Sequence, residues 1–124
     1  MKTVLLVDDD NSVVLTIGTR LKGMGYTVVT AKDAVAAIST CRKTQPDVVV
    51  LDISLPAGDG FGVADRLQSF HGFAAAPIIF ITSNENPDIR ERAMKHGAVA
   101  FLKKPIDAAE LASAIESALS PTDK

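Results

Sequence analysis

The sequence VVVLDISLPAGDG, from Val48 to Gly60, places the carboxylate of Asp52 directly behind four apolar residues. A continuous apolar run of this length is typical of a strand that is covered on both faces. The proline and glycines that follow predict a turn, in which Gly58 and Gly60 would adopt backbone angles that other residues resist. The stretch therefore predicts a buried strand with an acidic side chain at its end.

Other apolar segments of similar length alternate with stretches of helical periodicity. The predicted strands are Thr3 to Val7, Tyr26 to Thr30, Asp47 to Leu51, Pro77 to Thr82 and Val99 to Lys103. The predicted helices cover 12–24, 60–70, 87–96 and 108–119, and a further helix follows Asp33 with Ala34, Ala37, Ile38 and Cys41 on its inner face. Asp33, Asn86 and Asp107 are the predicted N-caps, and Gly25 and Gly97 the predicted ends. This alternation predicts an α/β fold in which helices wrap an open parallel sheet.

Composition limits the classes of protein to which the chain can belong. Its 124 residues suit a single domain over 1–124, and 47% hydrophobic with 23% charged residues is ordinary for a globular protein. The net charge of −2 and the lack of a basic run predict no direct binding of nucleic acid. No segment approaches the roughly 20 apolar residues of a membrane span, so we expect no membrane contact and a cytoplasmic location. Cys41, the single cysteine, is expected to be a packing residue.

Polar side chains follow four of the predicted strands. Asp8 and Asp9 follow the first, Asp52 the third, Thr82 the fourth and Lys104 the fifth. Because ligands of doubly wound sheets collect at the carboxyl ends of the strands, we expect these side chains to meet at one edge. Crowded carboxylates suit Mg²⁺, and a lysine and a hydroxyl suit phosphate oxygens, so the set predicts phosphoryl chemistry at Asp52.

Both histidines fall outside this predicted site. His71 and His96 lie at expected helix ends and not at strand ends. We therefore expect both to be surface residues without a part in the chemistry.

The order of the motifs LLVDDD, VVVLDISLPAGDG, IIFITS and GAVAFLKKPI resembles that of the receiver domain of two-component response regulators. The resemblance covers the chain from Thr3 to Leu119. It implies a flavodoxin-like fold with five parallel strands in the order 2-1-3-4-5 and five helices. It also implies a phosphorelay function for a stand-alone receiver similar to chemotaxis regulators.

Residue roles follow from the resemblance by position. Asp52 would be the phosphoacceptor, with Thr82 and Lys104 contacting the phosphoryl group. Mg²⁺ would be bound by Asp9 directly, by Asp8 mainly through water, by Asp52, and by the backbone carbonyl of Ser54. Thr82 and Phe101 would form the switch, and the bond before Pro105 would be a cis peptide. Asp10 is expected to open the first helix rather than bind metal.

The implied partners are a sensor histidine kinase or a histidine phosphotransfer protein, and a downstream target. The resemblance implies a switch that catalyses only its own phosphorylation and dephosphorylation. Val99 and Ala100 stand where many DNA-binding relatives carry an acidic pair, and the segment ELASAIESALS lacks arginine, so that salt-bridged dimer is not expected.

Three alternatives remain. An aspartate-nucleophile phosphatase would need a second acid where Ser54 stands. A flavodoxin-like cofactor carrier would need backbone amides for a phosphate where DDDN would repel it. The third is a protein-interaction module on the same fold that works without phosphate.

Overall fold

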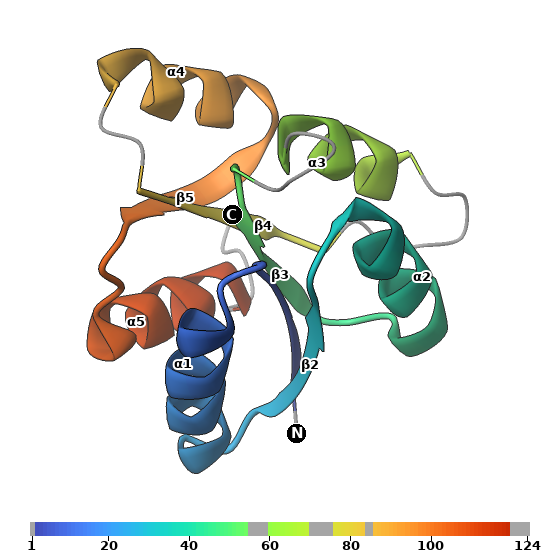
Figure 1. Cartoon of the computed structure of the whole chain (residues 1–124), viewed down its shortest axis with the longest axis vertical. Coiled ribbons are helices and arrows are strands. Elements are labelled where there is room, and N and C mark those ends of the chain that lie inside the picture. The colour runs from blue at the N-terminus through green and yellow to red at the C-terminus, as the bar shows by residue number, and fades with distance from the viewer. Residues whose placement is uncertain (1, 55–59, 70–75, 84–85, 120–124) are drawn as a thin grey trace.

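A computed structural model of the chain describes residues 2–54, 60–69, 76–83 and 86–119. Strands and helices alternate along these ranges, as Figure 1 shows. The strands are β1 (Thr3–Val7), β2 (Thr27–Ala31), β3 (Val48–Asp52), β4 (Ile78–Thr82) and β5 (Ala98–Lys103). The helices are α1 (Asn11–Gly23), α2 (Ala34–Thr44), α3 (Gly60–Gln68), α4 (Pro87–Lys95) and α5 (Ala108–Leu119).

The strands form one parallel sheet in the order β2-β1-β3-β4-β5, which confirms the predicted fold and strand order. The central strand β3 is buried along its whole length, and its last residue, Asp52, pairs with Ile81 of β4. A strand with a partner on each side and helices over both faces has little freedom to move. The fold therefore holds the Asp52 carboxylate in a fixed position at the edge of the sheet.

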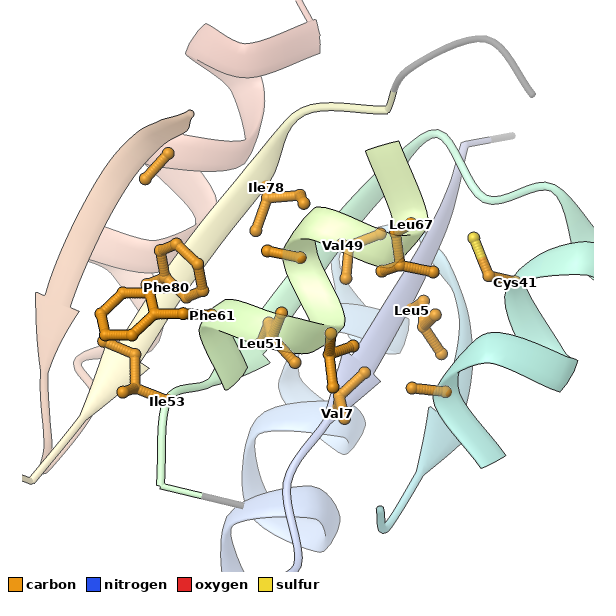
Figure 2. Packing of buried hydrophobic residues seen from close by; sticks show 14 of the residues in the cluster. Leu5, Val7, Cys41, Val49, Leu51, Ile53, Phe61, Leu67, Ile78 and Phe80 are labelled. Atoms are coloured by element: carbon orange, nitrogen blue, oxygen red, sulfur yellow. The ribbon is translucent and has the colours of Figure 1, made fainter. Parts of the chain in front are cut away.

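Alternate residues of the central strands contribute to two separate cores. Leu5, Val49, Leu51 and Phe80 pack under α2, α3 and α4, as Figure 2 shows for part of this cluster. Their sequence neighbours, among them Leu6, Val48, Val50, Ile79 and Ile81, pack under α1 and α5. The continuous apolar runs of the sequence thus reflect burial on both faces of the sheet.

Local sequence signals set most of the helix boundaries. Asp10, Asp33 and Asn86 each accept a hydrogen bond from a first-turn amide as N-caps. Asp107 accepts one from the amide of Ala109 in the same way. Gly25 and Gly97 have φ angles of 101° and 86°, which glycine adopts readily. These caps and ends agree with the predictions, and the predicted strands differ from the observed ones by one residue at individual ends.

The predicted reason for Gly60 was wrong. Gly60 begins α3 without a positive φ angle, and its amide donates a hydrogen bond of 2.8 Å to the carbonyl of Ile53. A Cβ atom at this position would lie 2.6 Å from the Asp52 carbonyl oxygen and 2.7 Å from the Ile53 Cα. Gly60 is therefore required by close packing of α3 against the end of β3, not by its backbone angles. Gly58 lies outside the described residues.

We predict that Gly60→Ala lowers the free energy of unfolding by about 2 kcal/mol, because the added methyl group must push α3 away from the β3 backbone. Urea denaturation measures the change. The matched control is Gly23→Ala at the end of α1, where a Cβ meets nothing within 4 Å. The free energy of unfolding of the control should be unchanged or higher by up to about 1 kcal/mol. Equal stability of the two variants would contradict the steric explanation.

Candidate functional site

Three carboxylates meet at the carboxyl edge of the sheet. Asp8 and Asp9 follow β1, Asp52 ends β3, and one oxygen of each lies within 4.8 Å of the others. Asp8 is fully buried and Asp52 nearly so, whereas Asp9 is exposed. Oxygen ligands on one exposed and two buried carboxylates suit a hard cation such as Mg²⁺, which keeps several waters. The residues present therefore fit the ion that the sequence predicts at this place.

Lys104 is the cation that faces this cluster. Its Nζ lies 2.9 Å from Asp8 Oδ2 and donates a hydrogen bond of 3.2 Å to Asp52 Oδ2. Its backbone amide donates to the carbonyl of Thr82 at 2.7 Å, and the peptide bond that follows, Lys104–Pro105, is cis. Lys103, the last residue of β5, is exposed. The structure thus brings Lys104, and not its neighbour, to the acidic cluster.

Backbone amides orient the two buried carboxylates. The amide of Ser54 donates to Asp52 Oδ1 at 2.9 Å, and the amide of Asp10 donates to Asp8 Oδ1 at the same distance. Each carboxylate therefore has one oxygen held by the backbone and a second that faces Lys104. The Asp10 side chain accepts instead from the amide and hydroxyl of Ser12, in agreement with its predicted role at the start of α1.

The charged groups of the site shift one another's pKa values. Burial raises the pKa of Asp8 above its ordinary value of 3.8, and the charge of Asp52 adds to this increase. Burial alone would lower the pKa of Lys104, but the hydrogen bond to Asp8 and the charge of Asp52 outweigh it, so this pKa is raised. One ammonium among three carboxylates leaves net negative charge in a partly buried place, which favours cation binding.

Thr82 and Phe101 lie on the neighbouring strands β4 and β5. Thr82 is fully buried at the end of β4, next to Lys103 in the sheet register. Phe101 is half-buried near the middle of β5, and the guanidinium of Arg90 in α4 lies 6.0 Å from its ring centre. Thr82 thus ends the strand next to that of Phe101, and the ring of Phe101 lies near α4.

An aromatic contact between α3 and α4 was missed in the sequence. The ring centres of Phe61 and Phe80 lie 5.2 Å apart in an edge-to-face arrangement, and those of Phe61 and His96 lie 4.7 Å apart in a stack. Figure 2 shows the Phe61 and Phe80 rings next to each other. His96 Nδ1 lies 2.8 Å from Asp65 Oδ1. His96 is thus a partly exposed histidine at the end of α4, as predicted, and it also packs on Phe61. His71 lies outside the described residues. Phe61 and His96 lie 35 positions apart in the sequence, so no local sequence pattern predicts their contact.

Cys41 is buried in the core, as expected, and burial raises the pKa of its thiol to about 11. A thiol with this pKa is protonated at neutral pH and is a poor nucleophile. Cys41 therefore serves packing alone.

Residues 4–116 match the sequence model of the response regulator receiver domain. The chain belongs to this family. This receiver domain is similar to the probable transcriptional regulator ycf27 of Guillardia theta, with 36% identity over 98% of the chain and 46% of the relative. It is also similar to the DNA-binding dual master transcriptional regulator RpaA of Synechocystis, with 30% identity over 100% of the chain and 52% of the relative.

Solved structures of response regulators have the same fold as this receiver domain. The chemotaxis response regulator CheY4 of Vibrio cholerae superimposes with a TM-score of 0.88 and 28% identity, over 96% of this receiver domain and 99% of that chain. A putative response regulator from Chloroflexus aurantiacus superimposes with a TM-score of 0.90 and 28% identity, over 97% and 98% of the two chains. The flavodoxin-like architecture expected from the resemblance is confirmed.

The receiver domain spans about half the length of the curated relatives that it matches. Those relatives are named as transcriptional regulators, and one as DNA-binding, so the comparisons do not support the prediction that nucleic acid is never contacted directly. Among the residues that the structure describes, each helix is too short or too polar to cross a bilayer. A cytoplasmic location and a single domain over 1–124 stay predictions.

We predict that Lys104→Met lowers the free energy of unfolding by about 2 kcal/mol in metal-free buffer at neutral pH. The change leaves the buried Asp8 and Asp52 carboxylates without their ammonium partner, and the 17% exposure of Lys104 keeps the loss below that of a fully buried pair. The loss should shrink as the pH falls, because protonation of a carboxylate removes the unpaired charge. Urea denaturation at several pH values measures both effects.

The control for this prediction is Lys103→Met. The exposed neighbour should change the free energy of unfolding by no more than about 0.5 kcal/mol. Equal losses in the two variants would show that the ion pairs of Lys104 contribute nothing to stability.

Proposed function

We propose that this receiver domain is a phosphoacceptor switch that takes a phosphoryl group onto Asp52 from a phosphohistidine. The observation that supports this most directly is the position of Lys104, whose ammonium lies within 3.2 Å of two buried carboxylates beside a third. Placed there, the ammonium can neutralise charge on a phosphoryl group as it approaches Asp52. The partner would be a sensor histidine kinase or a histidine phosphotransfer protein.

In the transfer, a carboxylate oxygen of Asp52 forms a bond to phosphorus while the bond from phosphorus to the histidine nitrogen breaks. The leaving nitrogen keeps the electron pair and the product is an acyl phosphate on Asp52. The backbone amide of Ser54 holds one Asp52 oxygen, which fixes the direction of the carboxylate on β3. The Thr82 hydroxyl lies at the end of the adjacent strand, where it could donate to the transferred group.

The three carboxylates would hold Mg²⁺, with Asp9 and Asp52 as direct ligands, Asp8 mainly through water, and the Ser54 carbonyl completing the protein ligands. When bound, the ion supplies positive charge to the phosphoryl oxygens and relieves repulsion among the acids. The buried, desolvated Asp8 carboxylate supports this proposal, since its pKa is raised when no cation is present.

Phosphorylation would then shift an existing equilibrium rather than drive turnover of a substrate. The phosphoryl group adds charge and acceptor oxygens that can draw Thr82 toward it. Phe101 is half-buried two residues before Lys103, the β5 partner of Thr82, so a move of Thr82 can free space for its ring. The surface that would change is built from α4, β5 and α5, where a groove runs along Arg90, Phe101 and Glu110. A downstream target protein would bind there.

The first test is intact-protein mass after addition of acetyl phosphate, with Mg²⁺ or with a chelator. We predict one added phosphoryl group with Mg²⁺, none with the chelator, and none for Asp52→Asn. Asp33→Asn is the matched control, because Asp33 is an exposed helix cap outside the cluster and should be phosphorylated as the native chain is. Phosphorylation of Asp52→Asn would contradict the assignment of the acceptor.

The second test concerns the switch. We predict that beryllofluoride with Mg²⁺ shifts the ring resonances of ¹³C-labelled Phe101, and that Thr82→Ala reduces this shift to less than about half. The reason is that the ring responds to the site only through Thr82 and the adjoining strands. Tyr26, half-buried against the α1 and α5 side, is the internal control and should not move. An unchanged Phe101 would contradict the switch while leaving phosphorylation at Asp52 intact.

A further inference from the structure

A groove of about 460 Å³ lies between α2 and α3, away from the acidic cluster and from the α4, β5 and α5 surface. Figure 1 shows these two helices side by side over one face of the sheet. The lining residues are Val35, Ile38, Ser39, Arg42, Lys43 and Arg66. None of them takes part in the proposed phosphorylation or in the proposed switch.

The groove has an apolar part. Val35 is 76% exposed, the highest value among the large hydrophobic side chains of the described residues, and Ile38 beside it is 8% exposed. Val35, Ser39 and Arg42 follow one another at helical spacing, so they share one face of α2. An exposed valine next to a core isoleucine offers a place for an apolar side chain from another molecule.

Three cations border the apolar part. Arg42 and Lys43 lie in the last turn of α2, and Arg66 lies in the last turn of α3. All three side chains are exposed, and no carboxylate is among the described residues that line the groove. The charged side chains that line the groove are therefore positive, whereas the whole chain has a net charge of −2.

The helix dipole alone favours cations in the last turn of a helix, which is a simpler explanation than a binding site. It does not account for the exposed Val35, nor for the meeting of cations from two helices at one groove. Helix α1 provides the comparison, because Arg20 and Lys22 lie in its last turn on the other face of the sheet. If the helix dipole alone explained these cations, the last-turn cations of α1 and of α2 would affect the binding of a partner equally.

We infer that the α2–α3 groove docks an acidic amphipathic helix of a partner protein. From Val35 to Lys43 the groove extends about 12 Å, the length of two helical turns. Apolar side chains of the partner would contact Val35 and Ile38, while its carboxylates would pair with Lys43 and Arg66. Because the groove shares no residue with the acidic cluster, docking would not depend on phosphorylation of Asp52.

The test uses the full chain and a fluorescein-labelled peptide of about 15 residues, with leucine at helical spacing on one face and glutamate elsewhere. Anisotropy titrations should show binding that weakens as salt is added. Lys43→Gln combined with Arg66→Gln, and separately Val35→Ser, should each weaken binding about tenfold. Arg20→Gln with Lys22→Gln should change it less than about twofold. Urea denaturation should give the same cooperative transition for all variants as for the native chain, which shows that they fold.

Two further probes identify the class of partner. The same peptide with lysine in place of glutamate should not bind, and a short DNA duplex should bind no better to the native chain than to the groove variant. Absence of binding by the acidic peptide, equal loss in the α1 control, or groove-dependent binding of DNA would each overturn the inference. Failure of phosphorylation at Asp52 would leave it unaffected, since the groove lies apart from that site.

Discussion

The arrangement of this receiver domain depends on one cation held among acids. Lys104 contacts Asp8 and Asp52, which are almost fully buried, while Asp9 adds a third carboxylate at the exposed side. Charges of this kind persist away from water only when they are paired and hydrogen-bonded. The backbone amides of Asp10 and Ser54 each hold one oxygen of these two carboxylates, so the site is held in place yet keeps an excess of negative charge.

That excess links stability to function. Burial raises the pKa of Asp8 and the charge of Asp52 raises it further, so a bound cation would stabilise the ionised carboxylate. The proposed Mg²⁺ and the proposed phosphoryl group carry opposite charges and meet at the same place. Binding of the first prepares the site for the second, because it offsets repulsion between the acids and an incoming anion.

Close packing holds the other side of the same site. Gly60 lets α3 begin against the carbonyl of Asp52, and Phe61, the next residue, packs on Phe80 and on His96 at the end of α4. The end of β3, the start of α3 and the end of α4 are thus joined through a few direct contacts. These contacts connect the end of β3 to α4 without passing through Thr82 and Phe101, the residues of the proposed switch.

The sequence by itself determined the order of the elements, their caps and the polar residues at the strand ends. These features are local, because a cap is set by one side chain and the nearest amides, and a buried strand by its own apolar residues. The cis bond before Pro105, which the resemblance to receiver domains implied, is present. The roles of Asp52, Thr82 and Phe101 in phosphorylation stay predictions until the experiments are done.

The sequence predicted that Lys104 and Asp52 lie at one edge of the sheet, but only the tertiary structure decided their distance and the contacts that no sequence pattern indicated. It brought Lys104 within 3.2 Å of Asp52 across 52 positions of sequence, stacked Phe61 on His96, and placed cations of α2 and α3 around one groove. It also replaced a wrong reason for Gly60, since close approach of two backbones is invisible in a list of residues. Such contacts depend on the crossing of helices over the sheet, a property of the whole packed chain that no short segment contains.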